Sequence, residues 1–362
     1  MATGKEYGLG PHQFPRGWFV IAEASELQAK PLALKYFAKD FALYRGESGK
    51  PVLLDAHCPH MQCHLAADSA IIAREGAQIE GDSIRCPYHG WRFAADGSCD
   101  DIPYFDGPKP RSAKLESYLV EERLGCIWMW HDPEGKGPDF PVPDLPHWQN
   151  KSWIKWQLDH LGELDVHPQE IIDNMADARH LGPTHGAPCE YFENEFMDHI
   201  YIQRQGGLHQ EYQAMLRTTT WYEGPGILLS HQIFGDIESV EMIANTPVDD
   251  GRVKLWHGLM VNSGKENPTS ADVDQARELQ AGALASLAAD FGIWKHKKPA
   301  FRVLQLKTDG PFSLGRKWYT QFYVPREAVI AVHTMVNGVH GVVGLAEPPP
   351  ESLLHRQVLA DT

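Results

Sequence analysis

Two short fragments, HCPHM and RCPYHGW, constrain the fold of this chain more than any other feature of its sequence. The first places a cysteine and a histidine as Cys-x-His, and the second places them as Cys-x-x-His. The four residues are Cys58, His60, Cys86 and His89. A metal site shared by both fragments requires two loops that close on it from opposite sides. Gly90, directly after the second histidine, suits a tight turn close to such a site.

The combination of two thiols and two imidazoles is typical of two kinds of site. A Rieske [2Fe–2S] cluster takes two thiolates on one iron and two imidazoles on the other. Zinc accepts the same side chains, but zinc-finger spacing pairs cysteine with cysteine and histidine with histidine. The mixed pairing therefore predicts a Rieske-type [2Fe–2S] cluster on Cys58, His60, Cys86 and His89. A zinc-structured binding module is the alternative.

Composition limits the class of protein. The 362 residues suffice for two domains, each with its own core. A formal net charge of −15 argues against nucleic acid or an anionic membrane as a partner, because both bind basic surfaces. The acidic surface either docks a basic redox partner or keeps the protein soluble. With no apolar span of ~20 residues, no signal-peptide core and only six cysteines, we expect a cytoplasmic protein without a membrane span or a disulfide scaffold.

The first third of the chain predicts a small, mostly antiparallel β domain. Short strands such as GWFVIAE, FALYRG, PVLLDA and GCIWMWHD alternate with turn residues. A segment rich in proline and glycine, residues 132–146, then predicts a linker. We therefore expect a cluster domain over residues 16–132 and a second domain over residues 133–362, with residues 1–15 packed on the second domain.

The remainder of the chain predicts an α+β architecture. A helical pattern covers residues 163–180, and the longer alternating strands EYQAMLRTTTWY, GILLSHQIF, VEMIAN and VKLWHGLMV follow. A long amphipathic helix is predicted from a cap at Thr269 or Ser270 to about Phe291. The stretch RKWYTQFYV predicts one further strand. A sheet with one long helix packed on it is an α+β fold.

A second group of candidate ligands lies in DNMADARHLGPTHG, where Asp177, His180 and His185 follow one another closely. Residues i and i+5 of a regular helix lie about 140° apart, too far to share a metal. The pair Gly182-Pro183 should break the helix and bring His185 back beside His180. Two histidines and one carboxylate are the ligands of an O₂-binding Fe(II) centre. Spacing does not select that carboxylate among 48 acidic residues, and with nineteen histidines a chance pair is the alternative.

The motifs CPH, CPYHGW and DNMADARHLGPTH together resemble the oxygenase component of Rieske non-haem iron oxygenases. More narrowly, the chain is similar to 3-ketosteroid 9α-hydroxylase oxygenases through QEIIDNMADARH, through THG followed by YFENEF, and through IWKHKKPAFRVLQLKTDGPFSLGRKWYTQFYV. The resemblance implies a Rieske domain, a helix-grip (START-like) catalytic domain and a homotrimer. One departure is LGPTHGAPCE, where the steroid enzymes carry aromatic residues between the ligand histidines, so the pocket is expected to differ.

On the matched positions, the resemblance implies roles for individual residues. It assigns three ligands to a mononuclear Fe(II): His180, His185 and Asp309 of TDGP. It also implies that Asp177 bridges to the cluster ligand His89 of a neighbouring subunit. Asn174 matches the family's asparagine near the iron.

The resemblance also distinguishes two kinds of Rieske cluster. Proteins of the respiratory-complex type carry a disulfide between cysteines at the positions of Cys63 and Tyr88. Tyr88 supplies no such partner, so this chain resembles the oxygenase type. The segment between His60 and Cys86 is longer than is usual in the family. We expect the excess to form a loop in DSAIIAREGAQ, which costs little closure entropy.

The activity implied by the resemblance is that of a terminal oxygenase: O₂-dependent hydroxylation of a bulky apolar substrate, foremost a steroid. The sequence has no flavin or nicotinamide fingerprint, so a separate NAD(P)H-dependent reductase or a ferredoxin should supply the electrons. One alternative is a desaturase or demethylase of another hydrophobic or aromatic substrate. Another is a Rieske protein that only transfers electrons.

Overall fold

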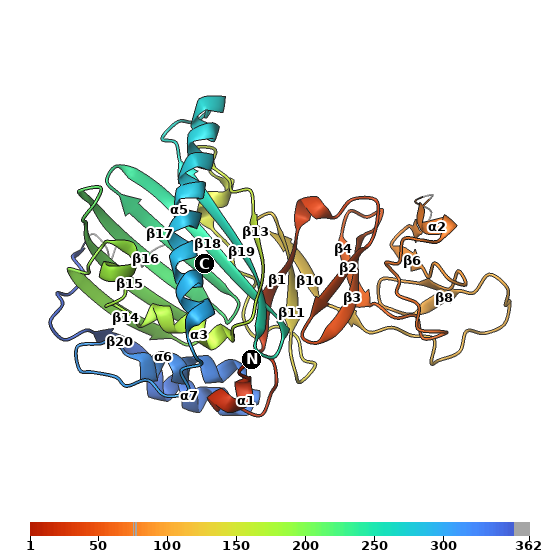
Figure 1. The fold of residues 1–362 in the computed structure, drawn as a ribbon. Coiled ribbons are helices and arrows are strands. Elements are labelled where there is room, and N and C mark those ends of the chain that lie inside the picture. Colours follow the sequence, from red (N-terminus) through yellow and green to blue (C-terminus); the bar gives the residue numbers. More distant parts are fainter. Residues whose placement is uncertain (75, 77, 351–362) are drawn as a thin grey trace. The chain divides into compact units, whose positions relative to one another are not determined.

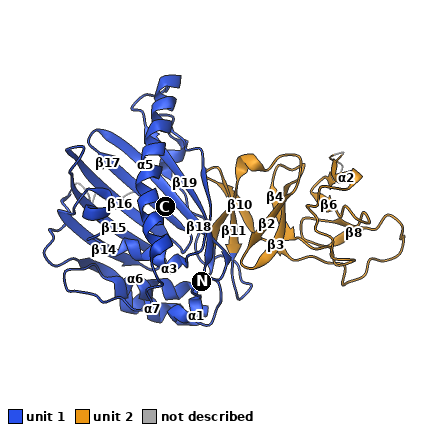
Figure 2. Cartoon of the chain, in the orientation of Figure 1, with its two compact units in different colours: residues 1–17, 131–362 blue, residues 18–130 orange. Residues whose placement is uncertain are grey.

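The computed structural model describes residues 1–74, 76 and 78–350. The chain divides into two compact units, which we treat separately. Unit 2 is Trp18–Trp130, and unit 1 combines Met1–Gly17 with His131–Thr362 (Figure 2). The predicted α+β class with mostly antiparallel sheets is confirmed.

Unit 2 contains three small sheets. The first sheet consists of β1 (Gly17–Glu23), β11 (Cys126–His131) and β10 (Val120–Arg123). The second consists of β2 (Leu32–Tyr36), β3 (Lys39–Arg45), β4 (Pro51–Asp55) and β9 (Ser117–Tyr118). The third consists of β5 (Ile79–Glu80), β6 (Ser83–Arg85), β7 (Arg92–Phe93) and β8 (Cys99–Asp101). The two four-stranded sheets pair antiparallel throughout. Their apolar side chains share one core with Cys58 and Cys86, so both predicted thiolate ligands are fixed by packing.

The segment between the two ligand fragments carries a short helix, α2 (Ile71–Arg74). The C-terminal end of this segment is held by the buried side chain of Gln78. The Gln78 amide donates to the carbonyl oxygens of Leu65 and Arg85, and the Arg85 amide donates to the Gln78 carbonyl over 2.8 Å. The predicted loop in DSAIIAREGAQ therefore begins and ends at a fixed base, although residues 75 and 77 lie outside the described part of the chain.

Unit 1 is built on a nine-stranded sheet (Figure 1). In spatial order its strands are β12 (Trp153–Ile154), β19 (Arg252–Asn262), β18 (Ile237–Asp249), β17 (Ile227–Phe234), β16 (Ala214–Glu223), β15 (Ile200–His209), β14 (Tyr191–Met197) and β20 (Gly338–Gly341), and β13 (Asp159–Leu164) also pairs with β19. Every one of these pairings is antiparallel. The four longer strands expected from alternation are confirmed as β16 to β19.

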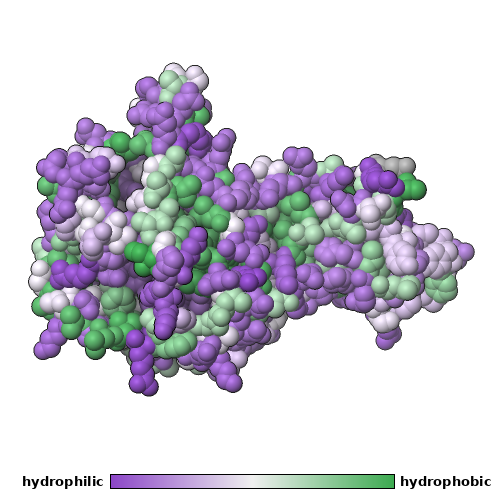
Figure 3. All heavy atoms as spheres, in the orientation of Figure 1, coloured by the Kyte–Doolittle hydropathy of each residue, from purple (hydrophilic) through white to green (hydrophobic). Residues whose placement is uncertain are grey.

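One long helix, α5 (Ser270–His296), lies across a face of this sheet (Figure 1). Thr269 caps it through a capping box with Asp272, as the sequence predicts, because each side chain satisfies the other's free backbone amide. Ala276 packs against Leu259 and Val261 of β19. On the face seen in Figure 3, hydrophobic side chains gather beside the middle of α5, whereas its first turns are hydrophilic.

Two secondary-structure predictions are wrong. The helical pattern over residues 163–180 is interrupted: β13 extends to Leu164, and then come α3 (Pro168–Ile172) and η3 (Asp173–Met175). The expected strand RKWYTQFYV belongs to α6 (Phe312–Tyr319) and η4 (Thr320–Phe322). Its buried residues recur at helical spacing: Gly315, Trp318, Tyr319, Phe322 and Tyr323. The aromatic and β-branched residues of this stretch are typical of a strand, but their packing follows the 3.6-residue period of a helix.

The remaining helices are short. They are α1 (Gly4–Tyr7), η1 (Ala24–Glu26), η2 (Pro146–Gln149), α4 (Leu181–His185), η5 (Arg326–Ala328) and α7 (Val329–Val336). The N-terminal segment packs on unit 1, where the Gly4 amide donates to Asp250 over 2.8 Å and the Arg16 amide donates to the Phe322 carbonyl over 2.8 Å. Among the helices of the described residues, none has the length and apolar character needed to cross a bilayer.

Candidate active site and metal centres

The predicted cluster ligands of unit 2 form a thiol pair and an imidazole pair. Cys58 and Cys86 are buried, and their thiols are hydrogen-bonded to each other. This contact is the largest cause that lowers the pKa of the Cys86 thiol to about 6. The rings of His60 and His89 lie 4.6 Å apart, and His60 is exposed while His89 is half-buried. Two thiols inside and two imidazoles toward the surface match the donor set of a Rieske cluster.

Both ligand loops are closed by the backbone of their cysteine. In the first, the Gln62 amide donates to the Cys58 carbonyl over 2.8 Å, and in the second the Gly90 amide donates to the Cys86 carbonyl over 3.0 Å. Gly90 has φ +75°, and a Cβ there would approach Pro103 to 3.1 Å. Glycine is therefore required for this turn.

Aromatic rings surround the imidazole pair. The ring of His60 stacks on Trp91 at 4.6 Å with an interplanar angle of 6°, and Tyr88 contacts His89 at 3.9 Å between ring centroids. Cys63 carries a free thiol and is half-buried beside Cys86. These contacts fix the ring planes from which the two histidines would bind iron.

In unit 1, the ligand atoms of His180, His185 and Asp290 lie within 4.8 Å of one another. The Nε2 atom of His185 is 3.3 Å from a carboxylate oxygen of Asp290. The rings of His180 and His185 are 5.2 Å apart at centroids. Two imidazoles and one carboxylate are the donor set of a non-haem Fe(II) site. The structure therefore brings the two predicted histidines together with an acid that the sequence prediction did not include.

The helix break that brings the histidines together does not lie where it was expected. Gly182 and Pro183 are inside α4 rather than between two helices, and His180 is the N-cap residue of that helix. Proline is tolerated in a first helical turn because its missing N–H would have no intrahelical partner there. The chain turns before His180 instead, and α4 ends at Gly186, with φ +71°. Because His180 is the N-cap at the start of this one-turn helix, the 140° separation expected within a longer regular helix does not keep the two rings apart.

Polar contacts behind the ring nitrogens orient both histidines. Nδ1–H of His180 donates to the Asp177 carbonyl over 2.6 Å, which leaves Nε2 for a metal. Nδ1 of His185 shares a hydrogen bond of 3.2 Å with the Ser286 hydroxyl of α5. Burial lowers the pKa of His180, but the hydrogen bond and charge of Asp177, with Asp290 beyond, outweigh burial and raise that pKa above its ordinary value. Such outer contacts commonly fix the tautomer of metal-binding histidines.

Asp177 also organises the turn that carries His180. Its carboxylate accepts the backbone amides of Arg179 at 3.1 Å and His180 at 3.2 Å. Burial raises the pKa of Asp177, but these contacts and the nearby imidazole hold it below its ordinary value. Asp177 is therefore a charged residue at the base of the histidine pair.

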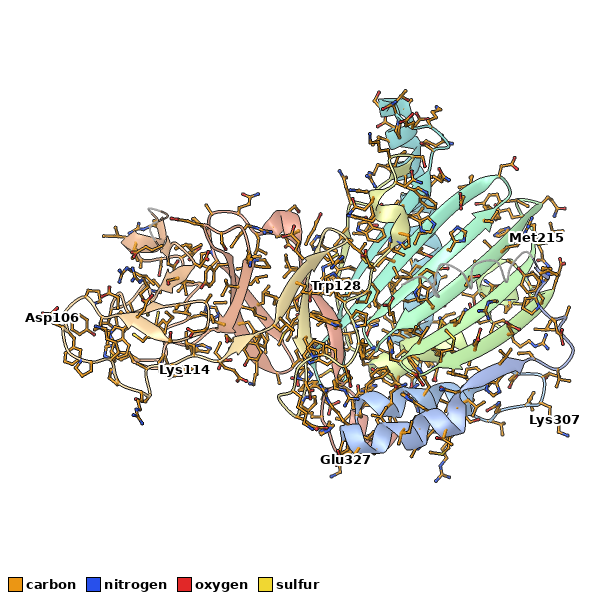
Figure 4. The ribbon with its side chains drawn as sticks, turned by 180° about the vertical axis from the view of Figure 1, so that it is seen from behind. Asp106, Lys114, Trp128, Met215, Lys307 and Glu327 are labelled. Atoms are coloured by element: carbon orange, nitrogen blue, oxygen red, sulfur yellow. The ribbon has the colours of Figure 1, made fainter. Side chains whose placement is uncertain are left out.

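Asp309 does not belong to this group of three. It is half-buried in the segment after α5, where its carboxylate accepts the Leu306 amide over 2.8 Å. Figure 4 labels Lys307, two residues earlier, on a loop at the edge of unit 1. Asp290 is thus the carboxylate that lies beside the two histidines in this structure, and the assignment of Asp309 as an iron ligand stays a prediction. A sequence signal existed: Asp290 shares the buried side of α5 with Leu287 and Trp294, and an acid on the buried side of a helix needs a charged or metal partner.

A cavity of about 220 Å³ opens beside the three candidate ligands. Its apolar wall includes Leu181, Leu216, Ile243, Leu287 and Trp294. Polar side chains of β15 to β18 also line it, on the same strands as Leu216 and Ile243. A substrate inside would lie against the open side of the ligand group.

Asn174, predicted near the iron, lines the same cavity. Gln203 of β15 donates to the carbonyl oxygens of Asn174 at 3.3 Å and Met175 at 3.1 Å, which fixes η3 on the sheet. Asp173 on the same turn pairs with Arg316 of α6. The turn before His180 is therefore held from two sides.

Two family models together cover most of the chain. The Rieske [2Fe-2S] domain matches residues 17–118, and the 3-Ketosteroid 9alpha-hydroxylase C-terminal domain matches residues 129–323, which is more than half of the chain. The chain belongs to the Rieske non-haem iron oxygenases. The predicted recognition is thereby confirmed, and an enzyme rather than a zinc module or a pure electron carrier is shown.

Curated relatives span nearly the whole oxygenase. A 3-ketosteroid-9-alpha-monooxygenase, oxygenase component, of Rhodococcus rhodochrous is 30% identical over 340 residues, 89% of this chain and 87% of the relative. The protein of that name from Mycobacterium tuberculosis is 29% identical over 88% of this chain and 84% of its own. Cholesterol 7-desaturase nvd 1 of Ciona intestinalis is 28% identical over 86% of this chain and 69% of the relative.

Solved structures share the fold of the oxygenase. Dicamba monooxygenase bound to dicamba has a TM-score of 0.65 at 21% identity, covering 90% of this chain and 97% of that one. NdmA of Pseudomonas putida CBB5 with caffeine has a TM-score of 0.67 at 16% identity, covering 94% and 99%. At these identities the likeness concerns the fold alone.

Proposed function

We propose that this oxygenase is the terminal component of a multicomponent monooxygenase that hydroxylates a steroid. The observation that carries the proposal is the group His180, His185 and Asp290 on a cavity wall, in a chain that also has a Rieske domain. The steroid substrate is supported by the relatives named 3-ketosteroid-9-alpha-monooxygenase, oxygenase component. A separate reductase or ferredoxin would supply the electrons, because these relatives are named as components.

The donor atoms fit two iron sites. Cys58, His60, Cys86 and His89 would hold the [2Fe–2S] cluster, and His180, His185 and Asp290 would hold one mononuclear iron. When bound, the cluster supplies electrons and the mononuclear iron supplies O₂ activation beside the substrate. The residues of the chain bind, orient and shield these groups.

The cavity residues would position the substrate and exclude water. Leu181 and Leu287 stand on the same walls as the ligand histidines, so an apolar skeleton packed on them displaces water from the open side of the site. Asp177 and Ser286 hold the imidazoles with their Nε2 atoms toward this side. We further propose a homotrimer in which Asp177 of one subunit contacts His89 of the next.

Iron content and product identity test the proposal. The purified enzyme should contain about three iron ions per chain, two in the cluster and one at the mononuclear site. With a matched reductase and O₂, a steroid should gain one hydroxyl group, detected by mass spectrometry. About two iron ions per chain and no oxygenated product from any steroid would reject the proposal.

A second candidate reaction is desaturation, favoured by the relative named Cholesterol 7-desaturase nvd 1. The same ligand group would serve either outcome. A product lighter by two hydrogens, with no added oxygen, would identify desaturation.

A further inference from the structure

The polar wall of the cavity consists of two rows that run across neighbouring strands. In the first row, Gln203, Thr220, Ser230 and Glu241 are successive cross-strand partners on β15 to β18. Gln205, Thr218 and Gln232 form the next row. All of these residues line the cavity. A wholly apolar substrate would offer this wall no hydrogen-bond partner, which costs free energy for each polar atom that is not already paired within the protein.

Glu241 is the charged member of the wall, and a buried histidine fixes its state. His257 of β19 is fully buried and lies between two carboxylates, with Nε2 at 3.0 Å from Glu241 and Nδ1 at 2.8 Å from Asp159. Because an ionised carboxylate only accepts hydrogen bonds, His257 donates from both ring nitrogens, as an imidazolium, when both partners are ionised. On the far side of this triad, Gln280 of α5 donates to Asp159 over 2.9 Å, and Arg277 donates to Gln280 over 3.1 Å.

The polar side chains next to Glu241 donate their hydrogen bonds to one another and to Glu241. The amide of Gln232 donates to Glu241 over 2.5 Å and to the Ser230 hydroxyl over 3.3 Å. The hydroxyls of Ser230 and Thr220 share a hydrogen bond of 2.7 Å. The Glu241 carboxylate retains acceptor capacity, since each of its oxygens can accept more than one hydrogen bond. This part of the cavity is therefore suited to a hydrogen-bond donor, which a ketone does not provide.

The triad and the candidate iron ligands contact different turns of the same helix. Gln280 contacts the triad, whereas Asp290 belongs to the ligand group, and ten residues of α-helix rise about 15 Å. Glu241 and the three candidate ligands all line the one cavity. An elongated substrate with one end beside the ligand group can therefore place its other end beside Glu241.

We propose that Glu241 is a specificity-determining residue that accepts a hydrogen bond from a hydroxyl or protonated amine at the far end of an elongated, otherwise apolar substrate. This inference rests on the proposed oxygenase function and names its substrate class. His257 and Asp159 are positioning residues that keep Glu241 charged and oriented.

Binding to three steroids that differ only at one terminal ring carbon tests the proposal. The probes carry a hydroxyl, a keto or an amino group there, and calorimetry on the anaerobic holoenzyme measures their affinities without turnover. The wild-type enzyme should bind the hydroxyl or amino steroid about 10- to 100-fold more tightly than the keto steroid, as expected for a hydrogen bond to a charged group. Whichever donor steroid binds more tightly identifies the group.

The variant Glu241→Gln removes the charge and adds an N–H donor at nearly constant volume. Its preference for the donor steroid over the keto steroid should fall at least tenfold. Glu238→Gln is the matched control: Glu238 is on the same strand and contacts His231 at 2.9 Å, but it is not part of the cavity wall, so the preference should stay unchanged. Glu241→Asp keeps the charge with a shorter reach and should retain part of the preference.

Equal or tighter binding of the keto steroid by the wild-type enzyme would overturn the proposal, and so would an equal loss of preference in both glutamine variants. The affinity ratio is independent of iron chemistry. A failure of the oxygenase proposal would show as missing mononuclear iron with the binding preference intact, so the two outcomes are distinguishable.

Discussion

The two proposed metal centres of the oxygenase are assembled in different ways. In unit 2, each ligand loop supplies one cysteine and one histidine within four residues, and backbone hydrogen bonds to the cysteine carbonyl close each loop. In unit 1, two histidines from one turn meet an aspartate from a helix far along the chain. A site made of local loops is visible in the sequence as spacing. A site completed by packing of α5 is visible only in part.

Replacing Cys58 should have the largest effect, because this ligand belongs to the core of unit 2. Cys58→Ala should abolish the cluster, its visible absorbance and all turnover, and should lower the melting temperature, since cluster binding and folding are coupled. Cys63→Ala, at the half-buried neighbouring thiol, should keep the cluster. Loss of the cluster in both variants would mean that thiol packing, not ligation, is being measured.

Replacing Asp290 should remove one metal and spare the other. Asp290→Ala should lose the mononuclear iron and reduce turnover by more than about 100-fold, beyond the range seen for outer-shell partners of a metal. The cluster signal in electron paramagnetic resonance should persist. Asp309→Ala should retain all iron, and the reverse pattern would reject Asp290 in favour of Asp309 as the ligand.

A third variant probes the connection between the two centres. Asp177→Asn can still accept the Arg179 and His180 amides through its side-chain oxygen, so the turn should survive. Both metal sites should stay loaded, while turnover and the rate of cluster reoxidation should fall about 100-fold, in the range for an outer-shell partner. Full activity would reject the bridging role.

The smallest effect is expected from removing the hydrogen bond between His185 and Ser286. Ser286→Ala removes the hydroxyl that contacts Nδ1 of His185, and the affinity for the mononuclear metal should fall about tenfold. Competition with a chelator measures this affinity. Glu278→Ala, on an exposed position of the same helix, should leave it unchanged. An unchanged affinity in Ser286→Ala would show that α4 alone orients the ring.

The same contrast explains what the sequence could predict. Cys58 and Cys86 stand in short motifs whose spacing sets the loop, and Thr269 and Asp272 mark the start of α5, so these features follow from neighbouring residues. Helical spacing puts Asp290 on the buried side of α5, but its position beside the two histidines depends on how α5 packs beside α4, which no local pattern encodes. The sequence wrongly predicts a strand in place of α6, because its aromatic residues are also typical of strands. Which of its residues are buried shows the helical period, and that burial depends on the rest of the fold.

The hydrogen bonds of Gln78 affect how the longer segment after His60 can change during evolution. By tying its base to Leu65 and Arg85, it insulates both ligand hairpins from changes in the residues that precede it. We therefore expect insertions or deletions within residues 68–74 to leave the positions of the ligands unchanged. The segment is thus a tolerant site, where a spectroscopic label or an affinity tag can be placed beside an intact redox centre.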